Sequence, residues 1–278
     1  MRVKHRYAFN SDEKAVMRFL NKHKIKYEKD ETTIILYLYE DDANYEFVSK
    51  FLNTQGAVDI PEAVYTLEEI ERAKWLTVRS SWLSQYPQPE KDWEYMHTTY
   101  DATNYCEGNE PIHYCGKGLV QKEPFVIRKA PNWGSRNFMM LNWVWDELFI
   151  SKKAEEVLMS SNLKGFEIYD VFNKSKKPFE EIKQIYVKNY LAEGICANSI
   201  KRKIVCPICN FVKYMSKPGY NCFHKEIFED IQVDIVKTTD KFGELGCTSL
   251  ILVTHRFYEV VTNAKLDRGF VFEPVELI

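Results

Sequence analysis

A repeated strand–helix–glycine–strand pattern constrains the fold of this chain more than any other feature of the sequence. The two copies cover about residues 138–172 and 250–276. In each copy a β-branched or apolar run ends at a good helix N-cap, Ser151 in the first and Thr254 in the second, and helix-periodic apolar residues follow. The pattern predicts that each copy forms a strand, a capped helix and a second strand.

The end of the helix is also repeated. Gly165-Phe166 and Gly269-Phe270 follow the two helical segments and open the second strands. Agreement in the cap, the helix face, the glycine and the strand favours an internal duplication over chance similarity of two amphipathic helices. Two copies are too few for a solenoid, so we expect them to pack together within one sheet-containing domain.

The first ninety residues predict a small α/β module. Strands are expected at Val3–Phe9, Thr33–Tyr39 and Leu76–Trp82. Helices are expected after Asn10, after about Asp42 and after Thr66. Glu13 and Glu69 stand three residues beyond Asn10 and Thr66, which is the spacing of a capping box.

The stretch Gln85–Asp92 contains two prolines and is the best candidate for a linker. The sequence therefore predicts an α+β protein with two domains. Residues 1–90 would form the N-terminal α/β module, and residues 91–278 would form the duplicated domain with a zinc-knuckle insert.

The seven cysteines do not suggest a disulfide framework, because the number is odd and the start of the chain lacks the apolar segment of a signal peptide. Cys206-Pro-Ile-Cys209 has the spacing of a zinc knuckle, in which both thiolates reach one metal. Buried thiols and, less favoured, redox chemistry are the alternative interpretations of this pair.

A single knuckle supplies only half of a tetrahedral zinc site. The equivalent place in the first half of the domain carries Cys115, but Ile112 stands at the position of the first cysteine of a CxxC pair. Cys106 is the favoured fourth ligand and His113 the alternative. The expected set is therefore Cys106, Cys115, Cys206 and Cys209 around a structural Zn²⁺, whereas Cys196, Cys222 and Cys247 are expected in the core.

Four segments together resemble the double-CxxCG motif proteins of bacteria: Tyr114–Phe125, Leu141–Ile150, Cys206–Cys209 and Gly269–Val275. The similarity covers about residues 106–278. Members of that family, and similar immunity proteins, are regarded as cytoplasmic antidotes to toxins delivered by neighbouring cells. The resemblance implies a non-enzymatic protein that binds a partner toxin and carries a structural zinc. This chain departs from the family pattern at Ile112 and at Asn210, which replaces the glycine after the second knuckle.

Enzyme chemistry is the weakest interpretation of the sequence. The histidines form no metal-binding motif, and no phosphate-binding glycine loop or nucleophile elbow is present. The adjacent acids Asp146 and Glu147 are expected to cap a backbone turn or to pair with a lysine or arginine.

The formal net charge of −2 excludes a general nucleic-acid coat. No apolar run is long enough to span a bilayer, so a cytoplasmic location is expected. Lys201-Arg-Lys203 before the knuckle, with Lys213 and Lys217 after it, leaves a nucleic-acid-binding zinc protein as the second functional candidate.

Overall fold

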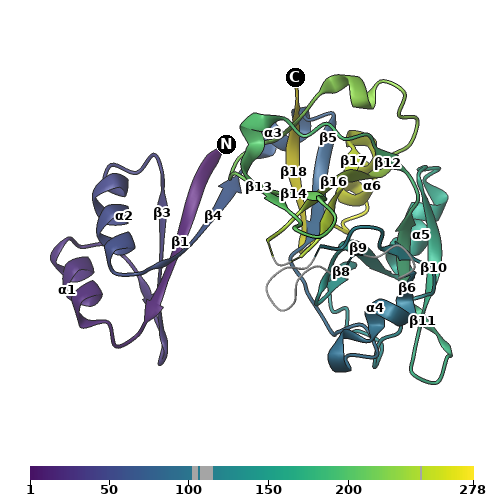
Figure 1. Ribbon diagram of the computed structural model, residues 1–278, viewed down its shortest axis with the longest axis horizontal. Helices are drawn as coiled ribbons and strands as arrows, with labels where there is room; N and C mark the ends of the chain where they lie inside the picture. Colours follow the sequence, from purple (N-terminus) through teal and green to yellow (C-terminus); the bar gives the residue numbers. More distant parts are fainter. Residues whose placement is uncertain (102–105, 107–114, 245) are drawn as a thin grey trace. The chain divides into compact units, whose positions relative to one another are not determined.

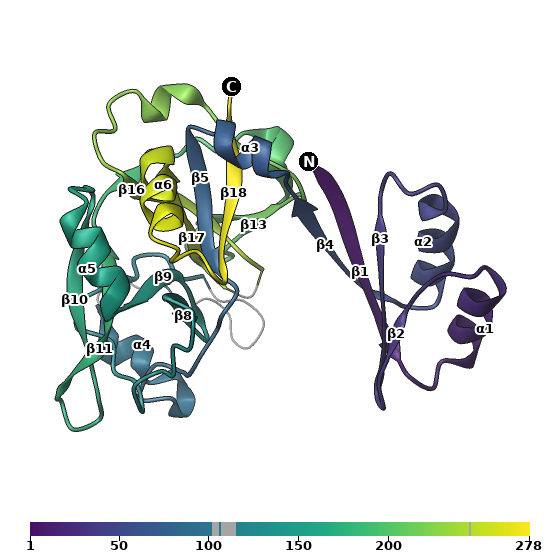
Figure 2. The ribbon, with the colours of Figure 1, turned by 180° about the vertical axis from the view of Figure 1, so that it is seen from behind.

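The computed structural model describes residues 1–101, 106, 115–244 and 246–278 (Figures 1 and 2). The described chain is mixed α+β, with 22% helix and 41% strand. It divides into two compact units. The first comprises Met1–Glu69 and Pro218–Tyr220, and the second comprises Ile70–Lys217 and Asn221–Ile278.

The first unit is a β-α-β-β-α-β arrangement. Its elements in chain order are β1 (Arg2–Asn10), α1 (Lys14–Lys22), β2 (Glu28–Lys29), β3 (Thr33–Tyr39), α2 (Tyr45–Thr54) and β4 (Val58–Val64). The strands form an antiparallel sheet in the order β2-β3-β1-β4. This is the ferredoxin-like pattern, in which both helices cover one face of the sheet.

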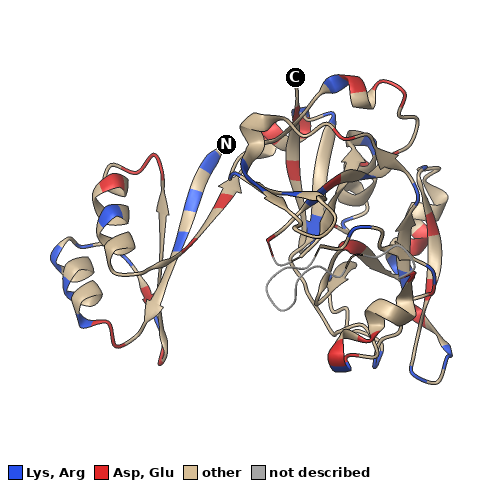
Figure 3. Cartoon of the chain, viewed as in Figure 1, with Lys and Arg blue, Asp and Glu red and all other residues tan. Residues whose placement is uncertain are grey.

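Alternation along β1 shows how the sequence sets the two faces of this sheet. Tyr7 and Phe9 are buried with Val16 and Leu20 of α1, whereas Arg2, Lys4 and Arg6 belong to the opposite face. Figure 3 shows the basic residues as separate blue bands along β1. Further members of the same core come from β3 and α2: Ile34, Leu36, Val48 and Leu52.

The two capping boxes expected in this region have different outcomes. Asn10 does not cap α1, because its backbone pairs with Thr33 as the last residue of β1, and α1 begins after Glu13 without a side-chain cap. The Thr66 box is confirmed at α3 (Leu67–Arg72). Thr66 N donates to Glu69 Oε2 at 2.8 Å, and Glu69 N donates to Thr66 Oγ1 at 3.2 Å.

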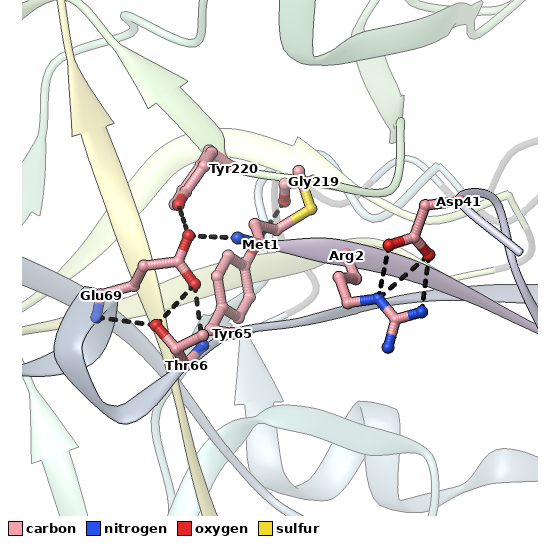
Figure 4. A network of polar contacts seen from close by, with 8 residues as sticks. All are labelled: Met1, Arg2, Asp41, Tyr65, Thr66, Glu69, Gly219 and Tyr220. Carbon is pink, nitrogen blue, oxygen red and sulfur yellow. Dashed lines mark hydrogen bonds and ion pairs between the residues drawn. The ribbon is translucent and has the colours of Figure 1, made fainter.

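Glu69 also ties the segment Pro218–Tyr220 to the first unit (Figure 4). Its carboxylate accepts a hydrogen bond from Tyr220 Oη at 2.6 Å and from the amino group of Met1. Tyr65 Oη donates to the carbonyl of Gly219 at 2.7 Å. These contacts lower the pKa of Glu69 to about 2, chiefly through the hydrogen bonds from Met1 and Tyr220.

The boundary between the units lies earlier than the expected position near residue 90. β5 (Trp75–Ser80) pairs with β17 and β18 and is therefore a strand of the second unit. The expected linker Gln85–Asp92 also belongs to this unit, where Gln88 is buried and its backbone N–H donates to Val126 O at 2.8 Å. Long-range strand pairing, which local composition does not reveal, shifts the boundary.

The second unit contains two main sheets. The smaller has the antiparallel order β10-β11-β9-β8. Its strands are β8 (Phe138–Leu141), β9 (Val144–Ser151), β10 (Phe166–Phe172) and β11 (Pro178–Val187). The larger has the order β13-β14-β16-β17-β5-β18-β15, and β12 pairs with β16. Its remaining strands are β12 (Tyr190–Leu191), β13 (Ile200–Val205), β14 (Val212–Ser216), β15 (Asn221–Phe223), β16 (Ile235–Phe242), β17 (Thr248–Thr254) and β18 (Phe270–Leu277).

Short elements connect these sheets. They are η1 (Lys91–Trp93), α4 (Tyr95–Thr99), β6 (Tyr100–Asp101), β7 (Val120–Gln121), η2 (Ala197–Ser199) and η3 (Lys225–Phe228). Over the described ranges, no helix is long and apolar enough to cross a membrane.

Both expected strand–helix–strand segments are present. The first is β9, α5 (Lys152–Ser160) and β10, and the second is β17, α6 (His255–Asn263) and β18. Ser151 and Thr254 cap the helices as expected, because their hydroxyl oxygens accept hydrogen bonds from the N–H groups of Ala154 and Phe257. In each segment one antiparallel strand lies between the two: β11 between β9 and β10, and β5 between β17 and β18.

The two segments lie in different sheets but share one hydrophobic core. Leu148 and Leu158 of the first segment belong to the same buried cluster as Val253 and Phe257 of the second. Gly165 and Gly269 precede the second strands with φ of +104° and +77°. Only glycine adopts such backbone conformations without strain, which explains its presence at both turns.

Candidate metal centre

A tight hairpin between β13 and β14 forms the knuckle. The strands pair as far as Val205 and Val212. Beyond them, Cys206 N donates to Phe211 O at 2.9 Å, and Asn210 N donates to Cys206 O at 3.0 Å. Asn210 has φ of +58°, a left-handed conformation that asparagine tolerates better than most other residues. Asparagine can therefore occupy the position where the double-CxxCG pattern has glycine.

The four expected cysteines come together from distant parts of the chain. The sulfur atoms of Cys106, Cys115, Cys206 and Cys209 all lie within 4.8 Å of one another. Cys106 Sγ is 3.8 Å from Cys206 Sγ, and Cys115 Sγ is 3.4 Å from Cys209 Sγ. A regular tetrahedron with Zn–S bonds of about 2.3 Å has edges of about 3.8 Å. The cluster therefore has the size of a Cys₄ metal site.

Backbone pairing brings Cys106 beside the other three. Its N–H donates to Lys117 O at 3.1 Å in an isolated β-bridge. Cys106 therefore lies beside the segment Cys115–Lys117. Cys115 and Cys206 are buried, whereas Cys106 and Cys209 are partly exposed.

The thiol pKa values differ within the cluster. Burial raises the pKa of Cys206, but N–H groups of Cys209 and Ile208 and the neighbouring thiols outweigh it and lower this pKa to about 6. Burial raises the pKa of Cys115 above its ordinary value. Backbone N–H groups directed at a knuckle sulfur stabilise the thiolate, which is the form that ligates metals.

The position of Lys213 differs from the one that the sequence predicted. Expected among the basic residues that flank the knuckle, it is instead almost fully buried in β14. Its ammonium donates to the carbonyls of Gly246 at 2.6 Å and Glu244 at 3.2 Å. Burial lowers the pKa of Lys213, and the nearby thiols of Cys247, Cys115 and Cys206 oppose this shift only in part.

The other cysteines lie outside the cluster. Cys196 and Cys222 are buried, and Cys196 N donates to Cys222 O at 2.9 Å. Cys222 Sγ donates to Glu276 Oε2 at 2.8 Å. Cys247 is partly exposed rather than a core residue. Ile112 and His113, the alternative ligand, lie outside the described residues.

The adjacent acids Asp146 and Glu147 have the structural partners that the sequence leads us to expect. Glu147 is buried and forms an ion pair with Lys237, and it also accepts a hydrogen bond from Gln184 Nε2 at 3.0 Å. Asp146 Oδ2 accepts a hydrogen bond from Ser249 N at 3.1 Å. The two carboxylates thus link β9 to the larger sheet.

Comparison with known proteins adds no family assignment. No family model matches this chain, and a search of curated proteins gives no match. The resemblance to double-CxxCG proteins remains a prediction from the quoted motifs.

Proposed function

We propose that Cys106, Cys115, Cys206 and Cys209 hold one structural Zn²⁺. The observation that carries this proposal is the mutual distance of their four sulfur atoms, none more than 4.8 Å from another. Thiolates favour zinc among the common divalent ions, and four protein ligands leave no open position for water or substrate. The metal would therefore stabilise the fold rather than catalyse a reaction.

This ion would link the knuckle hairpin, which carries Cys206 and Cys209, to the bridged segments that carry Cys106 and Cys115. Each of these segments brings only two thiols, so neither completes a tetrahedral site alone. Metal analysis of the purified protein tests the proposal directly, and one zinc per chain is expected. A metal-free protein that keeps its thiols reduced and its fold intact would contradict it.

We further propose that the protein is a non-enzymatic immunity protein that binds and neutralises a partner toxin. The resemblance to double-CxxCG proteins supports this function, and the cluster of four cysteines agrees with the structural metal that the resemblance implies.

We also propose that β9-α5-β10 and β17-α6-β18 derive from one duplicated unit. The matching caps, glycines and intervening antiparallel strands support the duplication.

The neighbouring reading frame supplies the test of toxin neutralisation. Its product should be toxic when expressed alone, and coexpression of this chain should restore growth in proportion to the amount of complex isolated. The Lys153→Gln variant, altered on the exposed side of α5, is a control for surface charge and should restore growth as the wild type does. Growth rescue without a stable complex would contradict neutralisation by binding.

A nucleic-acid-binding role is the second candidate, because Lys201, Arg202 and Lys203 are exposed on β13 immediately before the knuckle. Phosphate binding weakens steeply as salt rises, since it releases counterions. Binding of a single-stranded oligonucleotide at physiological salt, lost on Lys201→Gln and Lys203→Gln, would favour this role over toxin neutralisation.

A further inference from the structure

The second unit contains a cavity of about 810 Å³ that the proposed zinc site does not use. Cavities of this size bind small molecules and cofactors in many proteins. Aromatic side chains dominate its wall, among them Trp93, Tyr95, Trp143, Tyr169, Tyr186 and Tyr190.

Several of these rings lie nearly parallel and stack with one another. The rings of Trp93 and Trp143 are stacked, with centroids 4.7 Å apart and planes at 10°. Tyr95 stacks with Trp143 at 6.0 Å, and Tyr169 stacks with Tyr186 at 4.3 Å. Flat rings arranged in this way bind other planar π systems by offset stacking.

The backbone holds two of these indoles in an unfavourable conformation. Trp143 has φ of +70° in the two-residue turn between Leu141 and Val144, and Trp93 has φ of +59°. Bulky residues rarely adopt this region, and a glycine or asparagine would be relaxed there. Strain of this kind persists where a side chain is needed at a particular place, as in ligand-binding sites.

Of the charged side chains that line the cavity, Glu147, Lys237 and Lys188 form ion pairs, whereas Asp146 and Lys241 form none with the described residues. Glu147 pairs with Lys237, Lys188 pairs with Glu167 at 2.5 Å, and the carboxylate of Asp146 accepts the N–H of Ser249. Lys241 donates to Ser249 Oγ at 2.7 Å, and its ammonium lies 5.9 Å from the centre of the Tyr190 ring. Within the described part of the chain, no carboxylate lies within 4.0 Å of this ammonium.

We propose that this cavity binds a small planar aromatic molecule that carries an anionic group. The ring stacks on the aromatic wall, and the anionic group pairs with Lys241. A carboxylate and a phosphate ester would share this chemistry.

The site is also connected to the cysteine cluster by the chain. Gly116 and Gly118 line the cavity directly after Cys115. The proposal does not depend on zinc itself, but the binding measurements use the protein with its metal as purified, so that this wall keeps its position.

The test measures binding of indole-3-acetate by isothermal titration and by saturation-transfer NMR. Indole-3-acetamide controls for charge and cyclohexylacetate for aromaticity. We expect saturable binding of indole-3-acetate at one site per chain, and at least tenfold weaker binding of both controls. Phenyl phosphate, tested in the same way, separates a phosphate ester from a carboxylate.

Two variants locate the site. Lys241→Gln should bind the acetate and the acetamide equally, and Trp93→Leu should weaken both. Lys153→Gln, altered on the exposed side of α5, should leave binding unchanged. Trp93 is half exposed, so its replacement should leave the fold intact, which circular dichroism checks. Equal affinity of the wild type for acetate and acetamide, or no saturation by either aromatic acid, would overturn the proposal.

Discussion

Cys115 Sγ lies 3.4 Å from Cys209 Sγ, although 94 positions separate the two residues in the chain. This distance exceeds a disulfide bond of about 2.05 Å and is close to the edge of a zinc–thiolate tetrahedron. Four buried or half-buried thiols at this spacing repel one another once ionised, and a metal ion removes that repulsion.

Loss of one ligand should therefore remove the metal and destabilise the second unit. We expect Cys206→Ser to contain less than a tenth of the wild-type zinc and to unfold roughly 10 °C or more below it, since a structural zinc contributes directly to folding free energy. Elemental analysis and thermal unfolding measure both effects. Cys247→Ser, altered outside the cluster, should keep its zinc.

The identity of the fourth ligand can be decided by a matched pair of variants. Cys106 Sγ lies 3.8 Å from Cys206 Sγ, so Cys106→Ser should lose zinc as Cys206→Ser does. His113→Ala should retain a full equivalent. The reverse result would assign the fourth position to the histidine and remove Cys106 from the site.

The buried ion pair between Glu147 and Lys237 should be sensitive to removal of one partner. Lys237→Met leaves an uncompensated buried carboxylate, and we expect a loss of about 3–5 kcal/mol in the free energy of unfolding. The double variant with Glu147→Leu should recover much of this loss, because no charge remains buried. Urea unfolding provides the measurement.

A partly exposed pair serves as the control for this experiment. Lys188 and Glu167 form an ion pair in which both side chains are about half exposed. Lys188→Met should change the free energy of unfolding by less than about 1 kcal/mol. Equal losses in Lys237→Met and Lys188→Met would show that burial of the Glu147 pair has no energetic consequence.

Any residue with a side chain at Gly165, in the turn of the first strand–helix–strand segment, should destabilise the fold. A Cβ at Gly165 would lie 2.4 Å from the carbonyl oxygen of Ile235, in addition to the strain of φ +104°. We expect Gly165→Ala to cost about 3 kcal/mol or more. At Gly134 nothing lies within 4 Å, so Gly134→Ala should cost only about 1 kcal/mol from the positive φ alone.

Acid should abolish the contribution of Glu69 to the first unit. Its pKa is lowered from 4.5 to about 2 in the folded chain, so the unfolded state binds a proton at higher pH than the folded state. The stabilisation is complete above about pH 5 and disappears as the pH falls toward 2.

Thermal unfolding of Glu69→Gln against the wild type at several pH values tests this dependence. The difference in melting temperature should be constant at neutral pH and vanish near pH 2. The exposed Glu13 offers a control for removal of a carboxylate, since Glu13→Gln should leave the melting temperature at neutral pH nearly unchanged. A difference that grows in acid would contradict the assignment of the lowered pKa.

Local sequence patterns predicted much of this protein. The helix caps Ser151 and Thr254, the Thr66 capping box and the two glycine turns depend on residues a few positions apart, so each can be recognised without the rest of the fold. The proximity of the four cysteines was also predicted, from the spacing of the Cys206/Cys209 knuckle and from the four ligands that a tetrahedral metal site requires.

Tertiary structure decided the features that depend on distant pairing. β5 joins the second unit because it pairs with β17 and β18, and the same local sequence would suit a strand of the first unit equally well. Asn10 likewise ends a strand rather than capping a helix, because Thr33 pairs with its backbone. Burial of Lys213 beside the thiols and the aromatic cavity around Lys241 also arise only when separate strands meet. Interactions between residues a few positions apart can be predicted from the sequence alone. Contacts across sheets depend in addition on the register and order of the strands.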